Sequence, residues 1–243
     1  MDINGAVMLI TGASSGIGEA TARLASQQGA RLVLAARRQD KIEALAGELG
    51  DAIAVRCDVT DPRQLATAVE TAKDHFGRID VLVNNAGQGL QASIEDIKEQ
   101  DFRELLDLNL VAPLIAMQAV IPLMKTQGGG SIVNVSSGII FTPLPNTGAY
   151  NSSKAALATL SNIARAELAD AGIAVSTMYP FITKSGFIDS LKAGSEQAKQ
   201  MEAGVANYRH TPQQVAEKIL DLIRTGDERA DLVPEQFGGT FKG

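Results

Sequence analysis

The stretch Thr11-Gly12-Ala13-Ser14-Ser15-Gly16-Ile17-Gly18 joins a short apolar run to an amphipathic stretch that continues through Leu24 and Ala25. Glycines at such a turn allow a tight bend and close approach of the backbone to a ligand. The free N–H groups and the positive end of a following helix attract phosphate. The spacing is G-x3-G-x-G rather than G-x-G-x-x-G, and no Gly-Lys-Ser/Thr follows as in a P-loop. Alone, the turn could equally be a tight connection.

Outward from this turn, short apolar runs alternate with stretches of helical periodicity. Strands that alternate with helices of about ten residues or more predict βαβ crossovers and a parallel sheet. We therefore predict an α/β fold, a doubly wound, Rossmann-type, mostly parallel seven-stranded sheet with helices on both faces. The predicted strands span 6–11, 31–36, 52–57, 79–83, 131–135, 173–178 and 230–233, and the predicted helices 17–25, 42–49, 60–76, 101–124 (interrupted by Pro113 and Pro122), 149–171 and 211–224. Because such sheets bind ligands at the carboxyl ends of their strands, dinucleotide binding becomes the better interpretation of the turn.

The composition predicts one globular domain over residues 1–243. Hydrophobic residues make up 45% of the chain and charged residues 21%, a balance that can build a sizeable core. The formal net charge is −6 without any run of lysine or arginine, which argues against nucleic acid or an anionic membrane as the main partner. The apolar stretch 105–124 contains two prolines and Gln118, so we expect a buried helix face there rather than a membrane span.

Cysteine and histidine usage indicates neither a metal site nor an oxidising compartment. The one cysteine, Cys57, follows an apolar run and is expected to be a buried strand thiol. His75 and His210 have no second histidine or cysteine at ligand spacing, so no metal is predicted. The first residues contain no basic segment and no long apolar run, and a cytoplasmic protein is the default expectation.

Three polar residues in the second half of the chain predict proton transfer. Ser137 follows the predicted strand 131–135, and Tyr150 and Lys154 come later, four residues apart, so that they share one helix face. Tyrosine has an unperturbed pKa of about 10, and a cationic lysine beside it is expected to lower that pKa, while Ser137 donates to a developing oxyanion. An isolated pair of this kind is more often a helix anchor beside a solvated lysine. The glycine turn and the fold order favour catalysis here.

The chain resembles the short-chain dehydrogenase/reductase family, in its ordinary single-domain branch. The matching motifs arrive in family order from about residue 6 to 185, and the ordered set is specific although each motif is weak. They are T-G-A-S-S-G-I-G at 11–18, C-D-V at 57–59, N-N-A-G at 84–87, Asn109 in D-L-N-L, Ser137, Y-N-S-S-K at 150–154 and Pro180 after a strand.

This resemblance implies a catalytic set of Asn109, Ser137, Tyr150 and Lys154. Tyr150 would exchange the proton, Ser137 would position the carbonyl oxygen, and Lys154 would also hold the nicotinamide ribose. Asn109 would open its helix and help to hold a water that relays protons to Lys154. Beside Pro113, however, it could simply mark a helix irregularity.

The same motifs imply the positions that bind the cofactor. Asp58 would contact the adenine, with Val59 beside the ring, and residues 84–87 would brace the sheet and line the cofactor. The full implied set is Gly12, Ser14, Ser15, Gly16, Ile17, Gly18, Arg37, Arg38, Asp58, Val59, Asn85, Ala86, Gly87, Tyr150, Lys154, Pro180, Ile182 and Thr183.

The end of the second strand predicts NADP(H) rather than NAD(H). NAD-binding sheets place an acidic side chain there, about 20 residues after the glycine turn, to bind the ribose hydroxyls. Here the position is Ala36, which leaves room for a 2′-phosphate, and Arg37 and Arg38 follow. Guanidinium groups bind phosphate through charge-assisted hydrogen bonds, and we expect Arg37, nearest the strand end, to make the main contact. Two solvated loop arginines would explain the charges but not the missing acid.

Three places depart from the family pattern. Phe181 follows Pro180 where the family usually has glycine, residues 139–141 lack a frequent glycine, and the tail 234–243 lacks the usual Asp-Gly-Gly ending. We expect Phe181 to form part of the wall of a mainly apolar pocket. The other expected lining residues are Ile139, Phe141, Leu144 and Phe187.

Residues 184–210 are predicted to form a lid over the substrate site. The segment contains three glycines, has weak periodicity, and follows the strand that should end beside the nicotinamide. A plain pair of surface helices is the alternative. The apolar helices 101–124 and 149–171 predict self-association as a homodimer or homotetramer.

Together these features predict an NADP(H)-dependent oxidoreductase that moves a hydride between nicotinamide and a carbonyl or secondary alcohol substrate. Tyr150 would be the general acid/base. An alternative is a cofactor-binding regulatory protein without significant turnover, which usually shows a broken Ser/Tyr/Lys set, whereas all three residues are present here. A dehydratase or epimerase usually needs more substrate-binding chain. The family's substrates range from steroids to small ketones, so the resemblance does not choose among them.

Overall fold

The structure, a computed structural model, describes residues 1–204 and 206–242. Within that part of the chain the strands form one seven-stranded sheet in the order β3-β2-β1-β4-β5-β6-β7. Every neighbouring pair is parallel, which confirms the α/β prediction and makes the sheet parallel throughout. The strand order reverses between β1 and β4, the switch point where doubly wound sheets bind ligands. The strands are β1 (Val7–Thr11), β2 (Arg31–Ala36), β3 (Ala52–Arg56), β4 (Val81–Asn84), β5 (Gly130–Val135), β6 (Ile173–Tyr179) and β7 (Arg229–Asp231).

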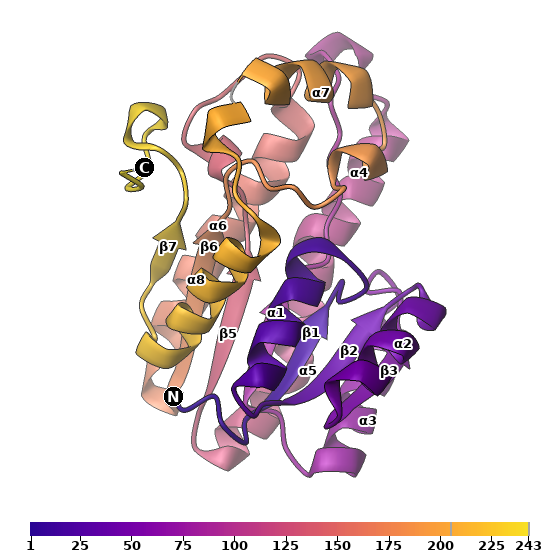
Figure 1. Cartoon of the computed structure of the whole chain (residues 1–243), viewed down its shortest axis with the longest axis vertical. Coiled ribbons are helices and arrows are strands. Elements are labelled where there is room, and N and C mark those ends of the chain that lie inside the picture. Colours follow the sequence, from indigo (N-terminus) through magenta and orange to yellow (C-terminus); the bar gives the residue numbers. More distant parts are fainter. Residues whose placement is uncertain (205, 243) are drawn as a thin grey trace.

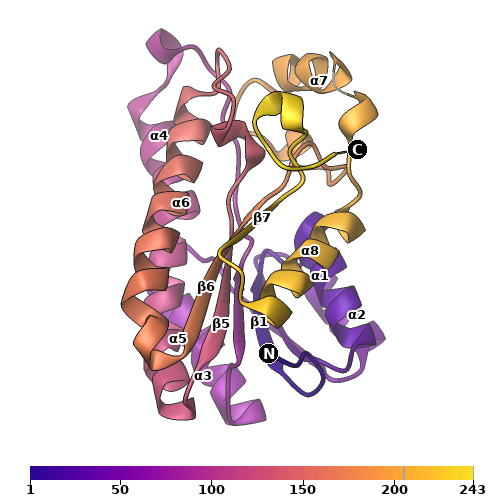
Figure 2. The ribbon, with the colours of Figure 1, turned by 90° about the vertical axis from the view of Figure 1, so that its left-hand side faces the viewer.

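Helices cover both faces of this sheet. The view along the sheet in Figure 2 shows α1, α2 and α8 on one side and α3, α5 and α6 on the other, while α7 lies above the upper end of the strands. The helices are α1 (Gly16–Gln27), α2 (Gln39–Leu49), α3 (Pro62–Phe76), α4 (Glu99–Leu106), α5 (Ala112–Gln127), α6 (Gly148–Leu168), α7 (Ser195–Gly204) and α8 (Pro212–Thr225). Shorter helical turns are η1 (Ile94–Asp96), the π-helical η2 (Asp107–Val111), η3 (Gly138–Ile140), η4 (Ala169–Ala171), η5 (Ile188–Ser190), η6 (Ala206–Tyr208) and η7 (Glu235–Phe237).

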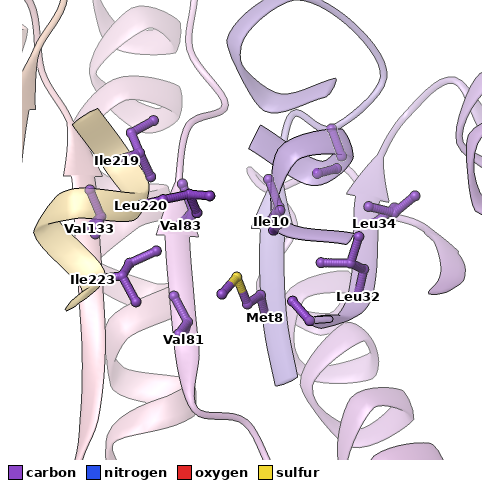
Figure 3. Packing of buried hydrophobic residues seen from close by; sticks show 14 of the residues in the cluster. Met8, Ile10, Leu32, Leu34, Val81, Val83, Val133, Ile219, Leu220 and Ile223 are labelled. Atoms are coloured by element: carbon purple, nitrogen blue, oxygen red, sulfur yellow. The ribbon is translucent and has the colours of Figure 1, made fainter. Parts of the chain in front are cut away.

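The core has two layers because successive strand residues point to opposite faces of the sheet. On β1, Met8 and Ile10 belong to the layer under α1 and α8, where Figure 3 shows them near Leu32. Val7 and Leu9 belong to the opposite layer. Burial of one such side chain contributes about 1.5–3 kcal/mol, so both layers hold the central strands, whose carboxyl ends carry the site, in place.

The helical run predicted at 101–124 extends from Glu99 to Gln127 without a break. It passes through the π-helical turn η2, and Pro113 lies in the first turn of α5, where its missing N–H costs little. By length and composition this run could cross a membrane, with a mean hydropathy of 1.7. However, 39% of its most apolar window is buried, and Ala116, Val120 and Met124 pack in the core under the sheet. The run is therefore a core helix, as expected.

Two predicted strand boundaries shift beside aspartates. The strand expected at 79–83 begins at Val81, and Asp80 before it is held against β1, because its carboxylate accepts from the Val7 N–H at 2.9 Å and from Arg78 at 2.6 Å. The last strand ends at Asp231 rather than at Val233. The Asp231 carboxylate accepts from the Val233 N–H at 3.1 Å, which folds the chain back at that point.

Candidate active site

A cleft of about 1120 Å³ lies at the carboxyl ends of the strands. Its lining includes every predicted site residue except Gly18 and Asn109. Both of these lie just behind the lining, Gly18 against Gly12 and Asn85, and Asn109 against Gly87. The fold therefore brings these segments, which are far apart in the chain, together in one continuous cleft.

The glycine turn uses its glycines for conformation and for close packing. Gly12 and Gly16 have φ angles of 67° and 59°, in the left-handed region that favours glycine. A Cβ on Gly18 would overlap the Gly12 carbonyl oxygen and lie 2.6 Å from Asn85 Nδ2. The helix begins after Ser15, whose side chain does not cap it, so the first N–H groups of α1 are free of a side-chain acceptor. This turn fits a dinucleotide diphosphate, which needs open N–H donors and no side chain in the way.

The loop after β4 is hydrogen-bonded to the end of β1. Asn85 Nδ2 donates to the Thr11 carbonyl at 3.0 Å, and the Thr11 hydroxyl accepts from the N–H groups of Asn85 and Ala86 at 3.0 and 3.1 Å. Asn84 Nδ2 donates to Asn134 Oδ1 at 2.9 Å in the buried interior. Residues 84–87 thus brace the sheet and lie directly beside the glycine turn, where Asn85 and Ala86 line the cleft.

Arg38, rather than Arg37, reaches the glycine turn. Its Nη2 donates to Ser14 Oγ at 2.8 Å and to Ser15 Oγ at 2.6 Å. Arg37 is exposed beside it, and Ala36, the position of the missing acid, is buried at the cleft wall. The expectation that Arg37 makes the main contact with a 2′-phosphate stays a prediction, and Arg38 is the arginine that lies against the serines of the turn.

At the end of the cleft where the adenine is predicted to bind, Asp58 is held by hydrogen bonds and Cys57 is a buried thiol. Asp58 Oδ1 accepts from the Thr60 N–H at 3.0 Å and from the Thr60 hydroxyl at 2.7 Å, and Val59 is nearly buried beside it. Cys57 is buried, as predicted, and burial raises the pKa of its thiol to about 11. The thiol is therefore protonated and unreactive near neutral pH.

Tyr150 and Lys154 are both desolvated, which changes the expected proton chemistry. Burial raises the pKa of Tyr150 to about 12, against a smaller lowering by the hydrogen bond with Ser137. Burial lowers the pKa of Lys154 to about 8, and its Nζ donates to the Val135 carbonyl at 2.9 Å. The expectation that Lys154 lowers the pKa of Tyr150 is wrong, because desolvation is the main cause of the shift and the smaller lowering comes from Ser137. At neutral pH the phenol keeps its proton and can donate it.

Asn109 lies at the centre of the π-helical turn η2 and is fully buried. Its Oδ1 accepts from the Gln88 N–H at 3.0 Å, and its Nδ2 donates to the Gln88 carbonyl at 2.8 Å and to Ser153 Oγ at 3.1 Å. A Cβ on Gly87 would lie 3.1 Å from Asn109 Oδ1 and 3.3 Å from Lys154 Nζ. Gly87 therefore keeps a small space between these two polar groups.

Gln88 and Ser153 hold Asn109 in this orientation, and neither residue is among the predicted site residues. Ser153 lies inside the Y-N-S-S-K motif, so its spacing was the one available signal. Ser136 is a third such residue, since its hydroxyl donates to the Lys154 carbonyl at 2.9 Å. All three act through other side chains, and we regard them as positioning residues.

The end of the cleft beyond Tyr150 is lined by aromatic and aliphatic side chains. The Phe187 ring lies 5.7 Å from the Tyr150 ring, and Phe181 stacks on Phe237 at 5.4 Å. Of the predicted lining residues, Ile139, Leu144, Phe181 and Phe187 line the cleft. Phe141 does not, because its ring turns away and packs edge-to-face on Tyr179 at 5.1 Å.

Described residues of the segment 184–210 line this end of the cleft, and the two ends of the segment are joined. The Lys184 N–H donates to the His210 carbonyl at 3.0 Å, and the His210 N–H donates to the Ile182 carbonyl at 2.8 Å. The described part of the segment contains η5, α7 and η6 although its sequence periodicity is weak, and α7 lies above the carboxyl ends of the strands (Figure 1). Residue 205 lies outside the described residues.

Polar bonds join this segment to the opposite rim of the cleft. Gln88 Nε2 donates to the Ser190 carbonyl at 2.6 Å, and the Lys192 N–H donates to the Gly89 carbonyl at 3.0 Å. The Lys192 ammonium binds Asp101 at 3.1 Å and also Glu104, both on α4. The segment thus spans the cleft from the β6 side to the α4 side.

Comparisons with known proteins agree with this geometry. The model of the short chain dehydrogenase family matches residues 6–196. The chain is 32% identical over 247 residues to an uncharacterized oxidoreductase of Listeria innocua, covering 98% of this chain and 96% of that protein. It is 39% identical over 173 residues to an uncharacterized oxidoreductase of Staphylococcus saprophyticus, covering 70% of each.

Similar solved structures also contain nicotinamide cofactors. One is a 3-ketoacyl-(acyl-carrier-protein) reductase from Brucella melitensis complexed with NADH, with a TM-score of 0.86, 29% identity and coverage of 94% of this chain and 97% of that one. Another is a short-chain dehydrogenase/reductase from Burkholderia phymatum in complex with NAD, with a TM-score of 0.89, 26% identity and coverage of 97% and 91%. The chain belongs to the short-chain dehydrogenase/reductase family and is an oxidoreductase of that family, which implies a nicotinamide cofactor.

Proposed function

We propose that the protein is an NADP(H)-dependent oxidoreductase that moves a hydride between nicotinamide and a carbonyl or secondary alcohol carbon, with Tyr150 as general acid/base. The observation that carries the proposal is the single cleft that connects the glycine turn to Ser137, Tyr150 and Lys154. Bound nicotinamide would supply or accept the hydride. The carbon chemistry therefore depends on the cofactor, and the proton chemistry on the side chains of this chain.

In the reducing direction, the phenol of Tyr150 gives its proton to the oxygen of the substrate as the carbonyl bond becomes an alcohol. Desolvation raises the pKa of the Tyr150 phenol, which lines the cleft, to about 12, so the phenol keeps that proton at neutral pH. Ser137, its hydrogen-bonding neighbour, is the second donor for the same oxygen. Lys154 and Asn109, on either side of Gly87, offer a path by which a proton returns to the phenol. Oxidation runs through the same groups in reverse.

The choice of NADP(H) rests on the end of β2. Alanine at position 36 leaves no carboxylate to repel a 2′-phosphate. The Arg38 guanidinium is already held by Ser14 and Ser15, so less side-chain entropy is lost when it binds phosphate. We therefore give Arg38 the main contact and Arg37 a secondary one. The two similar structures named above contain NADH and NAD, so this preference is a property that we propose for this chain alone.

We also propose a homodimer or homotetramer that buries the α5–α6 side of the molecule. Val111 and Ile163 are large apolar residues on this side with exposures of 39% and 51%. A partner helix pair would cover them, and light scattering at micromolar concentration should give a mass above that of the monomer. The cytoplasmic location stays a prediction from composition.

Replacement of Tyr150 by phenylalanine tests the proposed chemistry. With NADPH and a panel of aldehydes, diketones, steroids and acyl thioesters, Tyr150→Phe should lower kcat/KM by about 10²–10⁴-fold, because it removes the transferable proton. The dissociation constant for NADPH should change little. Tyr179→Phe, outside the cleft lining, is the matched control and should keep most of its activity.

A Tyr150→Phe variant with most of the wild-type kcat/KM would disprove this mechanism. Wild-type protein that binds NADPH tightly but reduces no member of the panel would instead favour the regulatory alternative.

A further inference from the structure

Two regions that depart from the family pattern in sequence contact each other in the structure. Phe181 follows β6, and Phe237 lies in η7 of the C-terminal tail. Their rings stack with centroids 5.4 Å apart and planes 21° apart. Tyr208 packs edge-on against Phe237 at 5.9 Å. The three rings form an aromatic cluster, and Phe181 and Phe237 are its members that line the cleft.

The tail is folded back so that Phe237 reaches the cleft. The Asp231 carboxylate accepts from the Thr240 N–H and from the Thr240 hydroxyl, both at 2.9 Å. The Thr142 hydroxyl donates to the Phe237 carbonyl at 2.9 Å, which ties the tail to the loop after Ser137. These bonds hold the Phe237 ring in one place, as a binding wall requires.

This aromatic wall lies next to the reacting groups. The Gly138 N–H donates to the Pro180 carbonyl at 2.8 Å, and Phe181 Cδ2 lies 3.5 Å from the position of a Cβ on Gly138. Gly138 directly follows Ser137, which positions the substrate oxygen in the proposed mechanism. A substrate whose carbonyl binds Ser137 therefore places its neighbouring substituent near the Phe181 ring.

The remainder of this end of the cleft contains many apolar side chains, and its described lining residues offer an anionic substrate no unpaired cation. Phe187, Leu144 and Leu191 are among its apolar lining residues. Among the described lining residues there, the cation besides the buried Lys154 is Lys192, and its ammonium is held by two carboxylates of α4. A phosphate or carboxylate substrate would have to break this pairing.

We infer that Phe181 and Phe237 form a specificity wall that selects neutral ketones with a flat ring beside the carbonyl. Aromatic faces bind flat rings by offset stacking or edge-to-face contact, in addition to the area that is buried. The stacked pair offers such a face, and the tail supplies half of it. This inference rests on the proposed function and names the substrate class of the same site.

The test compares kcat/KM with NADPH for 1-phenylpropane-1,2-dione, 2,3-butanedione and acetoacetyl-CoA. The first has a ring beside the dicarbonyl group, the second lacks the ring, and the third carries phosphates. Wild-type protein should prefer the phenyl diketone over butanedione by about tenfold or more, the gain that one buried ring gives. Equal values, or a preference for the charged thioester, would overturn the inference while leaving the proposed function intact.

Variants of the two phenylalanines then test whether these two rings cause that preference. Phe237→Ala and Phe181→Gly should each lower the ratio of phenyl diketone to butanedione activity by about tenfold, while Phe237→Leu should lower it less because bulk is kept. The double variant should lower this ratio by less than the product of the two single effects, since the rings act as a pair. An unchanged ratio, with both activities falling together, would show that the rings serve only the fold. Tyr150→Phe should reduce both activities, and if it does not, the proposed function itself fails.

Discussion

The glycine turn and the substrate end of the cleft are built by different kinds of contact. At the turn, Gly18 packs against the Gly12 carbonyl, and Asn85 bonds to the backbone of β1. At the substrate end, the contacts are between side chains of segments far apart in sequence, such as Phe181 with Phe237. The family model covers the first region completely but stops at residue 196, before η7 and the tail. Backbone packing thus fixes a shared cofactor site, whereas side-chain contacts set what this chain binds beside it.

Of the predicted effects, the largest should come from adding one methyl group to the glycine turn. In Gly18→Ala the new Cβ would meet the backbone of Gly12, which cannot move without shifting the turn. Overpacking of this kind should lower the free energy of unfolding by about 2 kcal/mol. The displaced turn should also raise the dissociation constant for NADPH, because the N–H groups that face the diphosphate move with it. Calorimetry and fluorescence titration measure these two changes.

Gly47→Ala is the matched control for this prediction. Gly47 lies within α2, and a Cβ there would have no heavy atom within 4 Å. Alanine should stabilise this helix by about 0.5–1 kcal/mol and leave NADPH binding as it is. If Gly18→Ala is as stable as Gly47→Ala and binds NADPH normally, the turn is not the closely packed site that we describe.

The same contrast explains what could be predicted from the sequence. The order of strands and helices follows from apolar periodicity, and the glycine turn from the conformations that glycine alone adopts readily. Tyr150 and Lys154 were recognisable because a spacing of four is local to one helix. These features depend on residues near each other in the chain, so a single sequence contains the information.

The parts that could not be predicted depend on long-range placement. The pKa of Tyr150 rises rather than falls because the fold buries it, and burial is not a property of the Tyr-x3-Lys spacing. The bond of Arg38 to Ser14 depends on how β2 ends relative to the glycine turn. Phe237 lies in a tail without periodicity, and Asp231 folds that tail back onto the cleft.

Removing the arginine beside the turn should have an intermediate effect. Arg38→Ala should raise KM for NADPH by about 10–30-fold, the loss of one charge-assisted contact, and leave KM for NADH nearly unchanged. Arg37→Ala should raise KM for NADPH less, because the serines of the turn hold the Arg38 guanidinium and not that of Arg37. Steady-state kinetics with both cofactors measure the difference.

Ala36→Asp tests the same cofactor preference with the opposite change. A carboxylate at the end of β2 would repel a 2′-phosphate and accept bonds from ribose hydroxyls, so the preference should reverse toward NADH. Wild-type protein with a higher kcat/KM for NADH than for NADPH would defeat the cofactor assignment. A larger effect of Arg37→Ala than of Arg38→Ala would return the main contact to Arg37.

The predicted lid should show the smallest effect, because partly exposed ion pairs hold this segment. Lys192 joins the segment 184–210 to Asp101 and Glu104 of α4. Exposed pairs contribute about 0.2–1 kcal/mol, so Lys192→Met should lower kcat/KM by about two- to threefold. The wild-type value should fall as salt is added, because salt screens exposed charges, and the variant should lose this dependence. Lys199→Met is the matched control, since Lys199 pairs with Asp189 and Glu196 inside the segment itself and does not bridge the cleft.

Hydrogen exchange shows whether the segment moves as a lid in this way. Cofactor and substrate together should slow exchange in residues 184–204 of the wild-type protein, because closure over ligands protects amides that open in their absence. Lys192→Met should reduce this added protection, and Lys199→Met should keep it. Protection that is the same with and without both ligands would mean that these residues are a fixed pair of surface helices. The ion pairs to α4 would then hold a static rim of the cleft, and the salt dependence of kcat/KM should be absent in the wild-type protein as well.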